Sequence, residues 1–178
     1  FKKNKLNKFQ YIHDSFGSNY RLTEIQSAIG LNQINKLDSM LKKRHSNAKI
    51  LEKIFLRNSD LFYTPIVPKN LKHAWYKFYV YISDSAIIKG FKRDVFLRLC
   101  REKKIKCLTG SCPEIYLENC FKNTSSIPKK RLPVAKKLGD VSLMFDIDPS
   151  FSKPKMINIA KKIKEIINKY KKNNNNYK

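Results

Sequence analysis

Hydrophobic residues recur at helical spacing along the first third of the chain. They form three groups: Leu22, Ile25 and Ile29; Ile34, Leu37 and Leu41; and Ala48, Leu51 and Phe55. This spacing predicts one long helix over residues 24–57. Because the phase slips between the first two groups, two helices with a break near Gly30 are the alternative. Thr23 and Gln26 have the spacing of a capping box, which places the helix start directly after Thr23.

A second stretch with the same periodicity lies near the end of the chain. Pro154 suits the first turn of a helix, where a backbone N–H is not needed. The apolar positions that follow match the i, i+3, i+4, i+7 template, and they are Met156, Ile159, Ala160, Ile163, Ile166, Ile167 and Tyr170. Residues 171–178 (KKNNNNYK) are low in complexity and are expected to be disordered.

A period of two marks the middle of the chain. In residues 75–82 (WYKFYVYI), the side chains of Tyr76, Phe78, Val80 and Ile82 would share one face of a strand. Shorter elements are expected around it: an extended connector over residues 60–70, a helix over 91–103, strands over 105–108 and 141–145, and a short helix over 114–121. Helices around a small, mostly antiparallel sheet make an α+β fold.

The charge of the chain is strongly positive. Lys and Arg number 38 against 14 Asp and Glu, which gives a formal net charge of +24 over 178 residues. Clustered cations would favour nucleic-acid binding, because phosphate contacts release counterions. Here the excess is spread along the whole chain, and lysine far outnumbers arginine, whose planar fork suits base edges. A basic nucleic-acid-binding module is therefore the weaker alternative, although the charge can attract small anions.

The composition also limits the class of protein. With 42% hydrophobic residues, the chain has enough apolar surface for one core. No apolar run approaches the roughly 20 residues that a membrane span needs. No signal-peptide segment follows the basic start, so a cytoplasmic location is expected. The cysteines lack the paired spacing of a zinc site, so no metal is expected; they are Cys100, Cys107, Cys112 and Cys120.

Three motifs, in order, carry a resemblance to a known family. They are residues 17–38 (GSNYRLTEIQSAIGLNQINKLD), 110–121 (GSCPEIYLENCF) and 132–145 (LPVAKKLGDVSLMF). Together they resemble the C-terminal part of the DegT/DnrJ/EryC1/StrS aminotransferases, pyridoxal 5'-phosphate (PLP) enzymes that aminate keto-sugars attached to nucleotides. The resemblance covers most of residues 17–167. It implies the small C-terminal domain of a fold-type I PLP aminotransferase, in which a long N-terminal helix and further helices accompany a small sheet.

The resemblance also implies a domain organisation. In the family, the lysine that forms the Schiff base with PLP lies some tens of residues before the Asn-Tyr-Arg turn. Only sixteen residues precede Gly17, and the lysines among them stand too close to the turn to take that place. We therefore expect residues 1–16 to be the cut end of a cofactor domain, 17–170 to be the aminotransferase C-terminal domain, and 171–178 to be a disordered tail. The fragment alone is not expected to be active.

Two residues of the first motif are candidates for the shared active site. The resemblance implies that the Asn19 amide contacts the PLP phosphate of the neighbouring subunit, whereas an Asx cap of the turn is the alternative. It implies that Arg21 lies near the same site, where a guanidinium suits a carboxylate or phosphate of the substrate. A solvated cation or an ion pair within the domain is the alternative for Arg21. The two functional roles together require a homodimer.

Further candidates for substrate binding lie in the middle of the chain. Ser111, Glu114 and Tyr116 belong to a turn that can face the substrate pocket. The alternative is that Glu114 caps a short helix and Tyr116 covers the core. His73 can stack on or hydrogen-bond a sugar ring, although a histidine at the start of a strand is more often structural.

Asp146 and Asp148 look like paired carboxylates for acid/base chemistry. At this place the resembling branch of the family has an apolar residue and a histidine, so the chain departs from the pattern. No phosphate-binding glycine loop, dinucleotide fingerprint or Ser/His/Asp signature occurs in the sequence.

These observations together indicate a sugar aminotransferase. The intact enzyme is expected to use PLP to transfer an amino group, from glutamate, to the keto carbon of a nucleotide-linked sugar. The product would enter a surface polysaccharide or another glycoconjugate. The alternatives are a non-catalytic regulatory relative of the family and the basic nucleic-acid-binding module.

Overall fold

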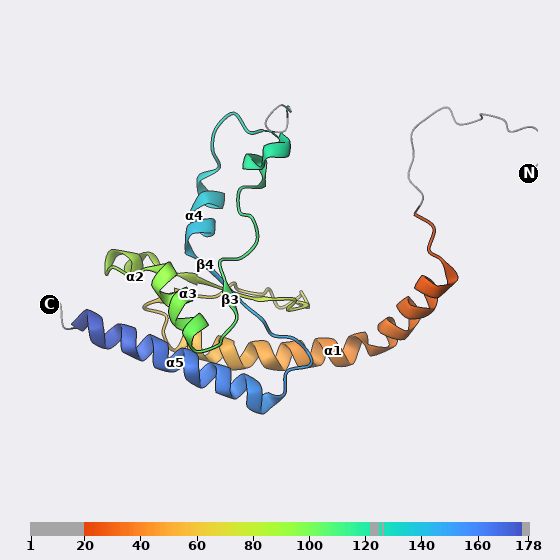
Figure 1. The fold of residues 1–178 in the computed structure, drawn as a ribbon, viewed down its shortest axis with the longest axis horizontal. Helices are drawn as coiled ribbons and strands as arrows, with labels where there is room; N and C mark the ends of the chain where they lie inside the picture. Colours follow the sequence, from red (N-terminus) through yellow and green to blue (C-terminus); the bar gives the residue numbers. More distant parts are fainter. Residues whose placement is uncertain (1–19, 122–124, 126, 176–178) are drawn as a thin grey trace, which may run out of the picture. The chain divides into compact units, whose positions relative to one another are not determined.

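The computed structural model describes residues 20–121, 125 and 127–175 (Figure 1). Internal contacts divide the chain into two units, Phe1–Lys36 and Leu37–Lys178, which we describe separately. The division falls within the first helix. The expected boundary after residue 16 lies outside the described residues and stays a prediction.

Helix α1 (Glu24–Leu56) is a single helix that passes through Gly30, so the sequence-based alternative of two helices is wrong. Its start is the predicted capping box. The Thr23 N–H donates to Gln26 Oε1 at 3.0 Å, and the Gln26 N–H donates to Thr23 Oγ1 at 3.3 Å. These reciprocal bonds satisfy two backbone donors at the helix end.

In the first unit, exposed apolar side chains lie on α1 and just before it, namely Ile25, Ile29, Leu31 and Ile34 on the helix and Leu22 before its start. In the second unit the same helix turns Ala48, Leu51 and Phe55 into the core. The predicted periodicity is therefore real in both units, but the described structure buries only the later part of it.

The second unit is built on a four-stranded sheet with the order β1-β2-β4-β3 and antiparallel pairings throughout. Its strands are β1 (Phe62–Tyr63), β2 (Phe78–Ile82), β3 (Cys107–Leu108) and β4 (Ser142–Phe145). The central pairing sets Phe78 opposite Phe145. The α+β architecture expected from the sequence is thus confirmed.

The remaining helical elements are α2 (Asp84–Ile88), α3 (Arg93–Glu102), the 3₁₀ turns η1 (Ile115–Leu117) and η2 (Asn119–Phe121), α4 (Pro133–Val141), and α5 (Lys153–Asn175). The short helix expected over 114–121 is replaced by the two 3₁₀ turns. Helix α5 continues past Tyr170 to Asn175, and the expected disorder of the tail stays a prediction. Residues 176–178 lie outside the described part of the chain.

One face of the sheet packs against helices. Figure 1 shows the second-unit part of α1 together with α5 on one side of the sheet and α4 on the other. Phe78 and Phe145 from the sheet meet Phe55 from α1, with ring centroids 5.9 and 5.4 Å apart. Helix α5 adds Met156 and Ile163 to this core. An aromatic cluster therefore joins α1 to the sheet.

The opposite face of the sheet carries tyrosines. Tyr63 of β1 stacks on Tyr81 of β2 with ring centroids 5.2 Å apart, and Tyr79 follows at 6.5 Å from Tyr81. Burial raises the pKa of Tyr81, and the neighbouring Tyr63 and Tyr79 raise it further. The candidate site lies on this face.

The expected strand over residues 75–82 begins later than predicted, at Phe78. Trp75 has a φ of +50°, in the left-handed region that bulky side chains rarely adopt. Because this turn breaks the alternation, Tyr76 is exposed and does not share the buried face of Phe78, so that part of the prediction is wrong.

Candidate functional site

A pocket of about 440 Å³ lies at the tyrosine face of the sheet. It is lined by His73, Tyr76, Lys77, Tyr79, Gly110, Ser111 and Met144. The pocket brings His73 and Ser111, two of the predicted substrate-binding residues, to one place. The antiparallel pairing of β2 with β4, in which Tyr79 lies opposite Met144, sets the floor between them.

The turn that carries Ser111 is fixed on Tyr79. The two hydroxyl oxygens are 2.8 Å apart, and the Ser111 N–H donates to Tyr79 Oη at 3.2 Å. Gly110 has a φ of +103°, and a Cβ there would lie 3.0 Å from Tyr79 Cε1. Glycine is therefore required where the backbone crosses the tyrosine ring. The result is a pair of hydroxyl groups on the pocket wall.

His73 is held by Trp75, two residues later in the sequence. The Trp75 N–H donates to His73 Nδ1 at 2.8 Å, and the two rings lie 4.3 Å apart. Since Nδ1 accepts this bond, the neutral imidazole carries its proton on Nε2 and offers an N–H donor. The strained Trp75 turn thus fixes the tautomer of a pocket residue.

Glu114 and Tyr116 are engaged elsewhere. The Glu114 carboxylate accepts hydrogen bonds from Arg131 at 2.8 and 2.7 Å and from Tyr116 Oη at 2.6 Å. The Arg131 guanidinium and the Tyr116 hydroxyl lower the pKa of Glu114 to about 2. Tyr116 Oη in turn accepts from the Leu132 N–H at 3.0 Å. This network ties residues 114–116 to 131–132, and neither Glu114 nor Tyr116 lines the pocket with Ser111.

The sequence analysis did not identify Lys77, Tyr79 or Arg131 as site residues. Lys77 lines the pocket and forms an ion pair with Asp146, which Lys106 also contacts at 2.7 Å. The neighbouring tyrosine ring lies 5.3 Å from the Lys77 ammonium. The pairing of β2 with β4 brings Lys77 to its carboxylate partner, which no local pattern of the sequence indicates.

The two carboxylates considered for acid/base chemistry have separate contacts. Partial burial raises the pKa of Asp146, but the ammonium groups of Lys106 and Lys77 outweigh it and hold the pKa below its usual value. Asp148 accepts a hydrogen bond from the Ser150 N–H at 2.8 Å, and contacts with Ser150 lower its pKa. Both groups are therefore ionised near neutral pH and suit structural roles.

The candidates of the first motif belong to the first unit, which is described separately from this pocket. Asn19 lies outside the described residues, so its predicted role stays a prediction. Arg21 is exposed in the first unit, two residues before the Thr23 cap of α1. A guanidinium beside backbone N–H groups at a helix start fits part of a phosphate site, although the Glu24 carboxylate in the first turn opposes an anion.

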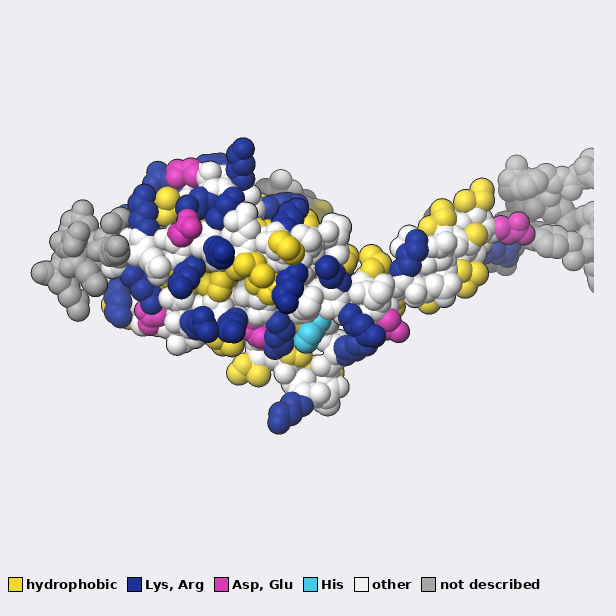
Figure 2. All heavy atoms as spheres, turned by 90° about the horizontal axis from the view of Figure 1, so that it is seen from below, with side chains coloured by type: hydrophobic (Ala, Val, Ile, Leu, Met, Phe, Trp, Pro, Cys, Tyr) yellow, Lys and Arg dark blue, Asp and Glu magenta, His cyan; other side chains and the backbone are white. Residues whose placement is uncertain are grey.

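Cationic side chains are dispersed on the surface. Figure 2 shows Lys and Arg scattered over one face, with hydrophobic patches between them. Within the described ranges, no helix has both the length and the apolar character that a membrane crossing requires. The expectation that nucleic acid is not a partner stays a prediction.

Comparison with known proteins identifies similar sequences. Residues 2–164 match the sequence profile of the DegT/DnrJ/EryC1/StrS aminotransferase family. An uncharacterized protein of Methanocaldococcus jannaschii is 26% identical over 151 residues, 85% of this chain and 38% of that protein. The UDP-4-amino-4,6-dideoxy-N-acetyl-beta-L-altrosamine transaminase of Helicobacter pylori is 43% identical over 54 residues, 30% of this chain and 14% of that enzyme.

A solved structure supports the same grouping. An aminotransferase from Psychrobacter cryohalolentis is 30% identical and superposes with a TM-score of 0.79, covering 95% of this chain and 45% of that one. The likeness confirms the expected fold, that of the small C-terminal domain of fold-type I aminotransferases. The chain spans less than half the length of these relatives.

Proposed function

Because the chain belongs to the DegT/DnrJ/EryC1/StrS aminotransferase family, we propose that the whole protein transfers an amino group to the keto carbon of a nucleotide-linked sugar. Glutamate is the proposed donor, and a surface polysaccharide or other glycoconjugate is the proposed destination. The similarity to a transaminase named for a UDP-linked amino sugar supports this substrate class. The activity is proposed for the whole protein, because this chain covers less than half of the solved relative.

The observation that carries the proposal is the pocket shared by His73 and Ser111. Its hydroxyl groups on Ser111 and Tyr79 are donors and acceptors of the kind that sugar hydroxyls need. Lys77 and Lys106 share the single Asp146 carboxylate, so a net positive charge suited to a phosphate group remains beside the pocket. The exposed ring of Tyr76 offers an apolar surface for a sugar ring. A concave site with a few convergent polar groups is typical of small-molecule binding.

PLP is the proposed cofactor, because the family depends on it. When bound, it withdraws electrons from the carbon that carries the amino group, so that a proton can leave. From this chain, Asn19 and Arg21 are the proposed contacts to phosphate groups, next to the start of α1. They would act across a homodimer, in which each subunit completes the site of its partner. The proposed location is the cytoplasm.

Glu114 and Tyr116 have an indirect role in this proposal. Their bonds to Arg131 and Leu132 hold the segment that carries Ser111, so they would position the pocket wall. Direct contact of Glu114 with a substrate would require it to exchange its partners.

The test is an amination assay on the full-length protein. Glutamate-dependent amination of a UDP-linked 4-keto-sugar is expected. Ser111→Ala and His73→Gln should each lower kcat/KM by roughly ten-fold, the effect of losing about one hydrogen bond. Ser46→Ala is the control, since its hydroxyl bonds only the Lys43 carbonyl on α1 at 2.9 Å among the contacts described.

Two results would contradict the proposal. Binding of PLP without amination of any keto-sugar nucleotide would indicate the regulatory relative. Strongly salt-dependent binding to duplex or single-stranded nucleic acid, again without amination, would indicate the basic binding module.

A further inference from the structure

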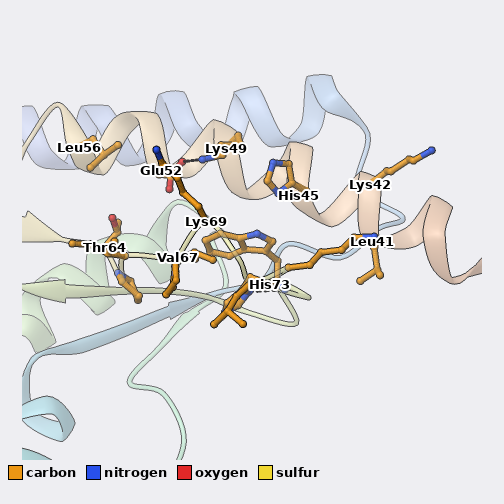
Figure 3. A pocket seen from close by; sticks show the side chains of 16 residues that line it. Leu41, Lys42, His45, Lys49, Glu52, Leu56, Thr64, Val67, Lys69 and His73 are labelled. Carbon is orange, nitrogen blue, oxygen red and sulfur yellow. Dashed lines mark hydrogen bonds and ion pairs between the residues drawn. The ribbon is translucent and has the colours of Figure 1, made fainter.

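A second and larger pocket, of about 760 Å³, lies between α1 and the segment that precedes β2. Figure 3 shows side chains entering it from both sides: Leu41, His45 and Glu52 from α1, and Val67, Lys69 and His73 from the facing segment. All of its lining residues belong to the second unit. His73 lines this pocket and the candidate site, so the two cavities share one side chain.

The lining of this pocket is largely apolar. Leucine, isoleucine, valine, proline and tryptophan make up half of its lining residues: Leu41, Leu56, Pro65, Ile66, Val67, Pro68, Leu71 and Trp75. Ile66 and Leu71 are strongly exposed to solvent, at 94% and 61%. An apolar ligand would therefore cover surface that water now contacts. The volume lies in the range of small-molecule sites.

The charge at the rim is positive. Glu52 is the only carboxylate among the described residues that line the pocket, and Lys49 pairs with it at 2.6 Å. Lys42, Lys69 and Lys72 also line the pocket. Lys72 lies 3.9 Å from Asp38, but both side chains are largely exposed, so solvent screens that pair. The rim therefore favours an anion.

The wall at Trp75 is held rigidly. Its φ of +50° is unfavourable for a bulky residue, and such strain persists only where the surroundings fix it. Here the indole is 5% exposed, stacks 5.7 Å from Phe78, and has its backbone N–H bonded to His73. The apolar wall is thus formed before any ligand arrives, which lowers the entropic cost of binding.

We propose that this pocket binds a small amphipathic anion, a molecule with one apolar group and one carboxylate or phosphate. The apolar group would lie against Trp75 and Val67, and the anionic group would lie at Lys69 and Lys72. This pocket shares His73 with the proposed sugar site, but the proposal does not depend on sugar binding there.

Trp75 is the only tryptophan of the 178-residue chain, so the emission that a Trp75→Phe variant loses is the signal that reports on the pocket. We would titrate the protein with decanoate and with decyl phosphate, below their micelle concentrations, and record the tryptophan emission. Either anion should give a saturable change, with affinity at least ten-fold higher than that of decanol, which has the same apolar group without the charge. The ratio of the two anion affinities distinguishes a carboxylate from a phosphate ligand.

Variants that remove lysine charges test whether Lys69 and Lys72 bind the anionic group of the ligand. The double variant Lys69→Gln/Lys72→Gln should bind the preferred anion at least five-fold more weakly while its affinity for decanol stays unchanged. Lys161→Gln on the exposed surface of α5 is the matched control and should have no effect. Equal affinities for decanol and the anions, no saturable change, or equal weakening by Lys161→Gln would each overturn the proposal.

Discussion

Arg131 donates two hydrogen bonds to the Glu114 carboxylate, from Nε at 2.8 Å and from Nη2 at 2.7 Å. Such bidentate pairs are stronger and more directional than single contacts. The bonds join Glu114, three residues after Ser111, to Arg131, two residues before α4. The pair thus closes the loop between β3 and α4 outside the pocket.

Replacement of Arg131 should therefore change the titration of Glu114. Its pKa of about 2 lies below the ordinary value of 4.5, so the pair stabilises the fold above pH 4.5 and the stabilisation is lost as the pH falls through 2. In Arg131→Gln, the Glu114 pKa should rise toward 4.5, as measured by carboxyl NMR. The stability difference from the wild type, from urea unfolding, should vanish toward pH 2. Arg98→Gln, which breaks an exposed 3.8 Å pair with Glu102, should leave the Glu114 pKa unchanged.

Phe55 is the residue of α1 on which the core most depends. Its ring contacts Phe62, Phe78 and Phe145 with centroids 5.2 to 5.9 Å apart, and the residue is fully buried. Phe55→Ala should lower the free energy of unfolding by about 3–5 kcal/mol through lost burial and a cavity. The neighbouring Leu56, 58% exposed, serves as control, and Leu56→Ala should cost less than about 1 kcal/mol. Equal effects in urea denaturation would contradict this packing.

Gly110 allows the backbone to cross Tyr79. In Gly110→Ala the new Cβ would meet the ring at 3.0 Å at a φ of +103°, so we expect a loss of about 1–3 kcal/mol in unfolding free energy. Gly30→Ala is the matched control, because no atom lies within 4 Å of the added Cβ and alanine favours a helix. Thermal unfolding should show destabilisation for the first variant only. A neutral Gly110→Ala would mean that the turn adapts and that Ser111 is not fixed.

The elements that the sequence predicted best are those determined by their own residues. The periodicity of α1 and α5 and the capping box at Thr23 depend on neighbours three and four residues apart, so local pattern is sufficient. Strand β1 was missed because its two residues become a strand only by pairing with Ile82 and Tyr81. Helix α2 has five residues, too few to show a period.

The residues of the candidate site likewise include some that the sequence indicated and some that only tertiary contacts reveal. His73, beside Trp75, and Ser111, on the turn of the second motif, were candidates from the sequence; both line the pocket, and their role in binding stays a prediction. Arg131 was missed, because its partner Glu114 lies 17 residues away and no spacing rule joins them. The left-handed backbone of Trp75 contradicts the preference of a bulky residue and arises from its packing on Phe78 and His73. The Arg131–Glu114 pair and the backbone conformation of Trp75 both depend on tertiary contacts, which a local sequence pattern does not contain.

Asp146 forms ion pairs with two lysines that precede different strands. Lys77 precedes β2 and Lys106 precedes β3, and both ammonium groups contact the carboxylate that follows β4. The side chain of Asp146 is only 17% exposed, so the ion pairs are screened less than surface pairs. Removal of the carboxylate should leave two cations facing each other at the edge of the candidate pocket.

Asp146→Asn should therefore lower the free energy of unfolding at pH 7 by about 1–3 kcal/mol, between the values for exposed and for buried pairs. Because the pKa of Asp146 is depressed below 3.8 in the folded state, its stabilisation is present above pH 3.8 and is lost as the pH falls through the folded value. Urea unfolding from pH 7 to pH 2 should show the two proteins converging at the acidic end. Asp38→Asn, whose side chain is 84% exposed, should match the wild type at every pH. A constant difference down to pH 2 would show that Asp146 acts through packing and not through its charge.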